Sequence, residues 1–193
     1  MTTALDPRDA AAVERFYRQH ARTVLRWVVR LGGPHLDAEA TAHDVFVVAM
    51  KRISTFDPTR PVEAWLFGIT RRVVANARRS AWFRRVIGLD PAMPVPSPDA
   101  GADTELDRLR RRRLVQELLD RLSADHREVI VLSDLEGRTA PEVAAMLDLS
   151  VGTVYSRLHH ARKNLAKLIG QDQAELEHGA LRESLRDALR EDA

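Results

Sequence analysis

The segment at residues 139–165 limits the possible folds of this chain more than any other. It opens with Thr139, Pro141 and Glu142, a capping box with proline in the tolerated first turn of a helix. A short apolar helix follows, and then a turn at Asp148, a residue that tolerates the left-handed backbone conformation. Ser150 caps a second helix, which is basic. This order of cap, short helix, turn and long helix predicts a helix-turn-helix.

The long helix of this pair, residues 151 to about 168, has an apolar side and a side rich in hydrogen-bond donors. In a helix-turn-helix its N-terminal turns enter the major groove of duplex DNA. The expected internal core is Val143, Leu147, Leu149, Val154 and Leu158. The side chains expected to contact base edges and phosphates are Thr153, Tyr155, Ser156, Arg157, His159, His160, Arg162 and Lys163. The alternative interpretation is a helical hairpin with a charged, solvated surface.

The N-terminal part of the chain is also helical in its periodicity. Asp6-Pro7 predicts the start of a first helix, and Gly32-Gly33-Pro34 predicts its end. A second helix is predicted over residues 37–53, with Asp37 as its cap, and a third over residues 62–79. The expected apolar face of the third helix is Trp65, Leu66, Ile69, Val73 and Val74.

A proline-rich stretch divides the chain. Residues 86–105 contain four of the nine prolines and no helical or strand period, which is typical of a flexible linker. The sequence therefore predicts an all-α protein with two small helical domains, at residues 1–85 and 106–169. An acidic extension follows at residues 170–193. It is predicted to form one more amphipathic helix or a disordered tail. The helix is indicated by the spacing of Leu176, Leu181, Leu185 and Leu189.

The charges are unevenly distributed, although the formal net charge is only +2. Residues 60–85 contain seven arginines and one acid, and residues 153–168 contain four bases and no acid. Two basic segments indicate a polyanionic partner that is contacted at two places or, equally, Arg-rich helices whose charged faces are simply solvated. On the third helix we expect Arg71, Arg72, Arg78 and Arg79 to bind nucleic acid. Trp65 and Phe67 are candidates for stacking on unpaired bases, although the apolar face favours a core position for Trp65.

The second helix combines an apolar stripe with exposed aliphatic side chains. Such a surface indicates a docking site for a partner protein or, equally, a solvated face. The stripe is Ala42, Val45, Phe46, Ala49 and Ile53, and the exposed positions are Asp44, Val47, Val48 and Lys51.

The chain contains no pattern of catalytic residues. It has no cysteine, no glycine-rich nucleotide loop and no histidine pair at metal-binding spacing. We therefore expect no enzymatic activity, no metal, no cofactor and no small-molecule substrate. The N-terminus lacks a signal-peptide pattern and no apolar run is long enough to span a membrane, so a cytoplasmic protein is expected.

Three stretches resemble the extracytoplasmic-function group of the sigma-70 family. Residues 37–58 (DAEATAHDVFVVAMKRISTFDP) are similar to the helix that binds core polymerase and the loop after it. Residues 60–80 (RPVEAWLFGITRRVVANARRS) are similar to the segment that melts and reads the −10 promoter element. Residues 114–165 are similar to the domain that reads the −35 element, with LSADHREVIVL and VGTVYSRLHHAR as the most specific runs. The resemblance covers about residues 10–85 and 108–168.

The resemblance implies a promoter-specificity subunit of bacterial RNA polymerase, with regions 2 and 4 as its two domains. It implies that the clamp helices of the largest polymerase subunit contact Asp44, Phe46, Val47, Val48 and Lys51. It implies that a flipped −10 base is captured by the loop with Asp57, Thr59 and Arg60. The rest of the −10 surface would be Trp65, Arg71, Arg72, Asn76, Arg78 and Arg79. Family members often have a Gln-Glu patch where this chain has Thr41-Ala42-His43-Asp44, and Asn in place of Arg72.

In the second domain, the resemblance implies that Tyr155, Ser156, His159 and His160 read −35 bases. The implied phosphate contacts are Arg157, Arg162 and Lys163, and Thr139 and Thr153 complete the −35 surface. The implied partners are core RNA polymerase, through its clamp helices and its flap, promoter DNA, and an anti-sigma factor. Three other interpretations compete: a dimeric helix-turn-helix regulator that does not join polymerase, a nuclease or recombinase, and a protein-only adaptor.

Overall fold

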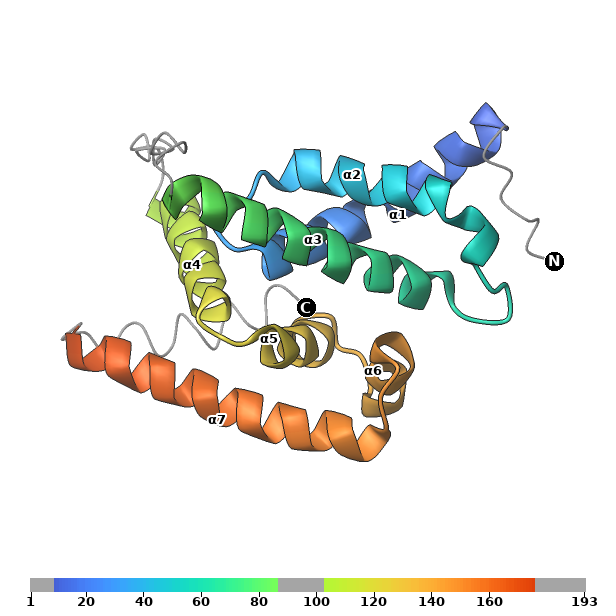
Figure 1. Ribbon diagram of the computed structural model, residues 1–193. Coiled ribbons are helices and arrows are strands. Elements are labelled where there is room, and N and C mark those ends of the chain that lie inside the picture. Colours follow the sequence, from blue (N-terminus) through green and yellow to red (C-terminus); the bar gives the residue numbers. More distant parts are fainter. Residues whose placement is uncertain (1–8, 87–102, 176–193) are drawn as a thin grey trace. The chain divides into compact units, whose positions relative to one another are not determined.

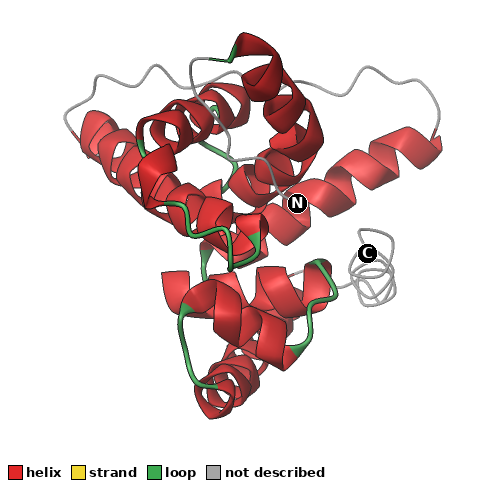
Figure 2. Cartoon of the chain, turned by 90° about the vertical axis from the view of Figure 1, so that its right-hand side faces the viewer, coloured by secondary structure: helices red, strands yellow, loops and turns green. Residues whose placement is uncertain are grey.

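The computed structural model describes residues 9–86 and 103–175, and the regular structure of these residues is helical throughout (Figure 2). This confirms the predicted all-α class. The chain divides into two compact units, and the main boundary between them falls between Asp90 and Pro91. The first unit contains α1, α2 and α3, and the second contains most of α4 to α7 (Figure 1). Most of the predicted linker, and the leucines predicted for a further C-terminal helix, lie outside the described residues.

The first unit is a bundle of three helices, α1 (Ala10–Gly32), α2 (Ala38–Lys51) and α3 (Val62–Val86), with a 3-10 turn, η1 (Ile53–Thr55), after α2. Each helix of the bundle packs against the other two (Figure 1). Trp27 of α1 meets Phe67 of α3 edge to face, with ring centroids 5.1 Å apart. Both side chains are fully buried, as are Val24, Val28, Val45 and Leu66.

The first helix starts later than the sequence predicted. It begins at Ala10, and the Oδ1 of Asp9 accepts hydrogen bonds from the backbone N–H of Ala11 (3.0 Å) and Ala12 (3.1 Å). The predicted cap, Asp6, lies outside the described residues. The predicted end is confirmed, since α1 stops at Gly32 and Gly33 follows with φ 79°, in the left-handed region that favours glycine.

The other two helices differ from prediction mainly at their C-terminal ends. Asp37 caps α2 as predicted, by accepting from the N–H of Ala40 at 3.0 Å. Ile53, which was predicted in the apolar stripe of α2, lies instead in η1 and is half-buried. The third helix continues past its predicted end at Arg79 to Val86, because residues 80–86 contain no helix-breaking Gly or Pro.

The second unit consists of α4 (Asp103–Asp120), α5 (Ala124–Ile130), a π-helical turn η2 (Val131–Leu135), α6 (Ala140–Leu147) and α7 (Val151–Glu175). Helix α7 packs against α5 and α4. The core of the unit is aliphatic, and its fully or almost fully buried members include Leu119, Val129, Ile130, Val131, Leu132, Leu135, Val143, Val154 and Ala161.

A buried arginine closes the end of α4. The Arg127 side chain is 5% exposed, and its Nε donates to the Leu119 carbonyl at 2.7 Å. Its Nη2 donates to the carbonyls of Leu122 (2.9 Å) and Asp120 (3.1 Å). The carbonyls of Leu119 and Asp120 lie in the last turn of α4, and that of Leu122 lies just after it, so the cation binds this end of the helix and complements its dipole. Arg127 therefore fixes the corner between α4 and α5, on which the later helices are built.

Candidate nucleic-acid interface

The capping box predicted at the start of α6 is present. The Oε2 of Glu142 accepts hydrogen bonds from the backbone N–H (2.8 Å) and the Oγ1 (2.7 Å) of Thr139. These two donors lower the pKa of Glu142 below its ordinary value, the hydroxyl contributing most. They hold the carboxylate ionised at the N-terminus of α6, where negative charge is also favoured by the helix dipole.

The turn between α6 and α7 has the predicted geometry. Asp148 ends α6 in the left-handed conformation, with φ 58° and ψ 51°, and its N–H and that of Leu149 both donate to the Ala144 carbonyl. The Oγ of Ser150 then accepts from the N–H of Thr153 at 3.1 Å and caps α7. Of the predicted internal core, Val143, Leu147, Val154 and Leu158 are buried, and Leu149 is half-buried. The helix-turn-helix is thus confirmed, and its two helices are held by caps at both starts.

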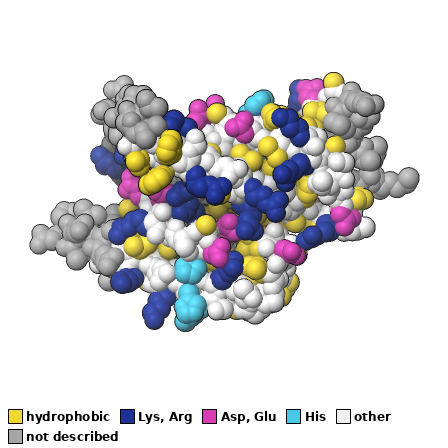
Figure 3. Space-filling view, in the orientation of Figure 1, with side chains coloured by type: hydrophobic (Ala, Val, Ile, Leu, Met, Phe, Trp, Pro, Cys, Tyr) yellow, Lys and Arg dark blue, Asp and Glu magenta, His cyan; other side chains and the backbone are white. Residues whose placement is uncertain are grey.

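The exposed side of α7 carries the side chains that the sequence predicted. Lys, Arg and His side chains lie along this helix at the lower edge of the view in Figure 3. Tyr155 is 62% exposed, which is high for an aromatic ring. Thr153 and Arg157 are half-buried, and the exposed members of the set are Thr139, Ser156, His159, His160, Arg162 and Lys163.

Two arginines of this set are bound to carboxylates of the same unit, which the sequence did not reveal. The Nη2 of Arg157 lies 3.0 Å from Oδ2 of Asp125. Arg162 makes a bidentate contact with Asp134, in which its Nε donates to Oδ2 at 3.1 Å and its Nη2 donates to Oδ1 at 2.5 Å. The hydrogen bond to Asp134 raises the pKa of Arg162 further above its ordinary value. A third contact joins Asn164 Nδ2 and His126 Nδ1 at 3.2 Å, so polar pairs fasten α7 to α5 and η2.

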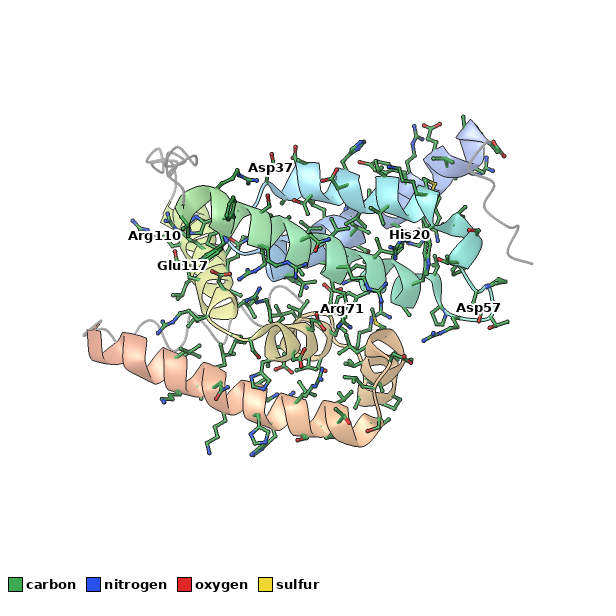
Figure 4. The ribbon with its side chains drawn as sticks, viewed as in Figure 1. His20, Asp37, Asp57, Arg71, Arg110 and Glu117 are labelled. Atoms are coloured by element: carbon green, nitrogen blue, oxygen red, sulfur yellow. The ribbon has the colours of Figure 1, made fainter. Side chains whose placement is uncertain are left out.

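In the first unit, the loop after η1 brings together Asp57, Thr59 and Arg60. The Oδ1 of Asp57 accepts from the N–H (2.9 Å) and the Oγ1 (2.7 Å) of Thr59, and the Arg60 N–H donates to the Asp57 carbonyl at 3.0 Å. The Thr59 hydroxyl is the main cause that lowers the pKa of Asp57, with the Thr59 N–H next. Figure 4 shows Asp57 at the far end of α2 from Asp37. The loop is exposed but ordered by its own hydrogen bonds, as a preformed binding loop needs to be.

The basic residues of α3 fall into two groups. Arg72, Asn76 and Arg79 are exposed, and Asn76 Oδ1 accepts a hydrogen bond from Arg79. Arg71 and Arg78 are half-buried, and Arg71 projects from the middle of the helix in Figure 4. The Nη1 of Arg78 donates to the carbonyls of Gly32 (3.0 Å) and Leu31 (3.4 Å). Arg78 therefore binds the C-terminal end of α1, in addition to any contact with DNA.

The two aromatic candidates of α3 differ in their surroundings. Trp65 is half-buried, with its ring 5.3 Å from that of Phe56 and its Nε1 3.4 Å from Thr55 Oγ1. Phe67 is fully buried against Trp27, so the prediction that it stacks on unpaired bases is wrong. The sequence placed Phe67 beside the apolar face but could not show that Trp27 closes over it.

The predicted docking surface on α2 is only partly at the surface. Asp44, Val47 and Lys51 are exposed and Val48 is half-buried. Phe46 is only 7% exposed, because the ring of Tyr17 covers it at a centroid distance of 4.7 Å. Phe46 therefore supports this surface from below.

Among the described residues, no cluster of three or more His, Cys, Asp or Glu side chains is arranged to hold a metal ion. None of the helices in residues 9–86 and 103–175 combines the length and the apolar character of a membrane span.

Two family models match the chain. The model for sigma-70 region 2 matches residues 16–84, which contain most of the first unit. The model for sigma-70 region 4 matches residues 112–165, which contain the helix-turn-helix.

The chain is also similar to individual proteins. It is 35% identical over 161 residues to the ECF RNA polymerase sigma factor SigL of Mycobacterium tuberculosis, which covers 81% of this chain and 88% of SigL. It is 35% identical over 152 residues to the RNA polymerase sigma factor CnrH of Cupriavidus metallidurans, which covers 73% of this chain and 78% of CnrH.

Solved structures of sigma factors are also similar to this chain. The structure of CnrH in complex with the cytosolic domain of CnrY matches with a TM-score of 0.62 and 28% identity, over 85% of this chain and 91% of CnrH. The structure of the sigma factor RpoE in complex with the anti-sigma factor NepR from Bartonella quintana matches with a TM-score of 0.57, over 81% of this chain and 96% of RpoE. The second likeness, at 23% identity, concerns the fold alone.

Proposed function

Because this chain belongs to the extracytoplasmic-function group of sigma-70 RNA polymerase sigma factors, we propose that its two helical units recognise the two elements of a promoter. As a sigma factor it is a non-catalytic subunit that binds core polymerase and promoter DNA and initiates transcription. The proposal assigns the parts of that function to particular side chains of this chain.

The second unit is proposed to read the −35 element with α7. Tyr155, Ser156, His159 and His160 face solvent and supply donors, acceptors and an apolar ring for base edges. Lys163 is exposed and suited to a phosphate, whereas Arg157 and Arg162 reach phosphates only by sharing or leaving their carboxylate partners. Thr139 and Thr153, at the starts of α6 and α7, complete this surface. The same unit is proposed to contact the polymerase flap.

The first unit is proposed to melt and hold the −10 element. The loop of Asp57, Thr59 and Arg60 would capture an extruded base, which offsets part of the cost of unstacking it. The strand beside it would be held by Arg71, Arg72, Asn76, Arg78 and Arg79, with Trp65 at the start of the same helix. The exposed positions of α3 support this role, because they present guanidinium and amide groups in one row.

The polymerase clamp helices are proposed to bind the exposed side of α2, at Asp44, Val47, Val48 and Lys51, with Phe46 beneath. An anti-sigma factor is proposed as a further partner. Proteins of similar fold have structures in complex with a partner chain, CnrH with the cytosolic domain of CnrY and RpoE with the anti-sigma factor NepR. The proposal would be tested by co-purification of a partner from the native source.

The observation that carries the proposal is the combination, in one chain, of a capped helix-turn-helix with a separate bundle that has an exposed basic row.

The experiment measures the capture of core polymerase by the purified wild-type chain and by its Asp44→Arg variant. Glu14→Arg is the matched control, because it also reverses an exposed carboxylate in the same unit. We expect stoichiometric capture by wild type and the control, loss by Asp44→Arg, and promoter-dependent transcription only where capture occurs. Tight duplex binding without capture of core would instead favour a regulator that does not join polymerase.

A further inference from the structure

Two adjacent histidines on the exposed side of α7 have only each other as a partner within the described part of the chain. His159 and His160 are both exposed, and their ring centroids lie 5.4 Å apart with an interplanar angle of 76°. Within residues 9–86 and 103–175, neither ring makes a hydrogen bond or an ion pair, so their nitrogen atoms are open to a ligand. Histidine is the side chain that ordinarily changes its charge between about pH 5 and 8, and only its protonated form donates from both nitrogens.

The two rings lie in the middle of the surface that is proposed to bind duplex DNA. Ser156 precedes them by three and four residues, and Lys163 follows them by four and three, so each is one turn away from both histidines. Ser156 and Lys163 are exposed as well. A ligand held by Lys163 therefore also meets the two imidazoles.

Helix α7 provides no counterion for a protonated ring. It contains no carboxylate before Asp172, which lies about three turns after His160. The cations on the same side are Arg157, Arg162 and Lys163 of α7 itself.

The titratable groups of the neighbouring elements are engaged with other residues. Helix α5 and helix α4 pack against α7, and η2 reaches it through Asp134. On these elements and on α6, Asp125 binds Arg157, Asp134 binds Arg162, Nδ1 of His126 contacts Asn164, Glu117 binds Arg113, Asp120 lies 4.0 Å from Arg127, and Glu142 binds Thr139. A positive charge on His159 or His160 is therefore balanced best by a polyanion from outside, and duplex DNA carries one negative charge for about each 1.7 Å of its axis.

We propose that His159 and His160 couple duplex binding by α7 to the uptake of a proton, so that the second unit binds DNA more tightly as the pH falls from about 8 to about 6. The proposal rests on the proposed function, because it concerns the same surface of α7. The proton comes from the solvent and stays on a ring while the complex lasts. There the ring donates to an acceptor of the duplex, which is a phosphate oxygen or the O6 or N7 of a guanine. Two like charges 5.4 Å apart oppose each other, so we expect about one proton for each complex.

The test measures the affinity of the full chain for two duplexes at constant ionic strength, from about pH 6 to about pH 8. One duplex carries the −35 region of a promoter that the holoenzyme transcribes, and the other has the same length with that region scrambled. Ordinary carboxyl pKa values of about 4 lie below this range. We expect the wild-type affinity to rise up to about tenfold for each unit by which the pH is lowered, and the double variant His159→Gln, His160→Gln to give a flat profile. His43→Gln, which removes an exposed imidazole from α2 of the first unit, is the matched control.

Calorimetry counts the protons directly. Binding heats measured in two buffers of different ionisation enthalpy should show uptake of about one proton by wild type and almost none by the double variant. If the acceptor is a phosphate, the slope of log affinity against log salt will be steeper by about 0.9 at the acid end of the range. If the acceptor is a guanine, lowering the pH will instead increase the preference for the −35 duplex over the scrambled one.

Two results would overturn the coupling. They are a wild-type affinity that does not change with pH, and a pH profile that is the same in wild type and in the double variant. Either result leaves the proposed function standing as long as the −35 duplex is preferred. Equal affinity for the two duplexes at every pH would contradict the proposed reading of the −35 element itself, whether or not protons are taken up.

Discussion

Short polar side chains at helix starts fix most of the element boundaries in this chain. Asp37, Thr139 and Ser150 each stand directly before an apolar helical period, and each was predicted as a cap from that position. The prediction was wrong at α1, where two aspartates precede the helix and the structure uses Asp9. Local sequence did not separate these two candidates, because Pro7 made the earlier start equally favourable.

The capping box makes the stability of the helix-turn-helix depend on pH. Because the folded pKa of Glu142 is depressed, its contribution is present above the ordinary glutamate pKa of about 4.3 and is lost as pH falls through the folded pKa. Glu142→Gln keeps an acceptor but removes the titration. We expect the melting temperature of wild type to exceed that of the variant at neutral pH, and the gap to shrink in acid. Circular dichroism melts of both chains across this range would measure it, and a gap independent of pH would contradict the assignment.

The buried ring of Phe67 has a structural role where the sequence allowed a role in DNA binding. We expect Phe67→Ala to reduce the free energy of unfolding by about 3–5 kcal/mol, because it leaves a cavity beside Trp27. Trp82→Ala is the matched control, since its ring is exposed and its removal leaves no cavity. Urea unfolding of the two variants gives the comparison. Equal stability of Phe67→Ala and wild type would show that the ring is not part of the core.

At the scale of elements, α7 has two kinds of cation. Lys163 is exposed on the helix, whereas Arg157 pairs with Asp125 of α5 and Arg162 pairs with Asp134 of η2. The carboxylates neutralise part of the charge that would otherwise attract DNA, and they fix the direction of α7 relative to α5 and η2. Sequence periodicity assigned all three residues to one surface, because it contains no information on partners distant in the chain.

This difference predicts unequal effects on duplex binding. Lys163→Ala should make the slope of log affinity against log salt shallower by about 0.9, the value for one phosphate contact. Arg162→Ala should change the slope less, because Asp134 already compensates that charge. Salt titrations of the full chain on the same −35 duplex would measure both slopes. A larger change for Arg162→Ala than for Lys163→Ala would mean that Arg162 leaves Asp134 on binding DNA.

At the scale of the whole molecule, the sequence was sufficient for the fold class, the helix-turn-helix and the family. Those features depend on local periodicity, caps and turns. The structure differs from the expectation where contacts between distant segments decide the position of a side chain. These contacts are Trp27 with Phe67, Tyr17 with Phe46, and Arg78 with the end of α1. The exposed rings of Trp82 and Phe83 on α3 were missed for another reason. The apolar face of α3 was judged complete at Val74, and the helix continues beyond it.

The tryptophans have a consequence for spectroscopy. All three lie in the first unit, and they are fully buried at Trp27, half-buried at Trp65 and exposed at Trp82. Intrinsic tryptophan emission therefore reports on the first unit alone, while far-ultraviolet ellipticity reports on the helices of both. Denaturation curves followed by the two signals will coincide only if the two units unfold as one cooperative system. A soluble quencher will reach Trp82 before the others, because its ring is the most exposed of the three.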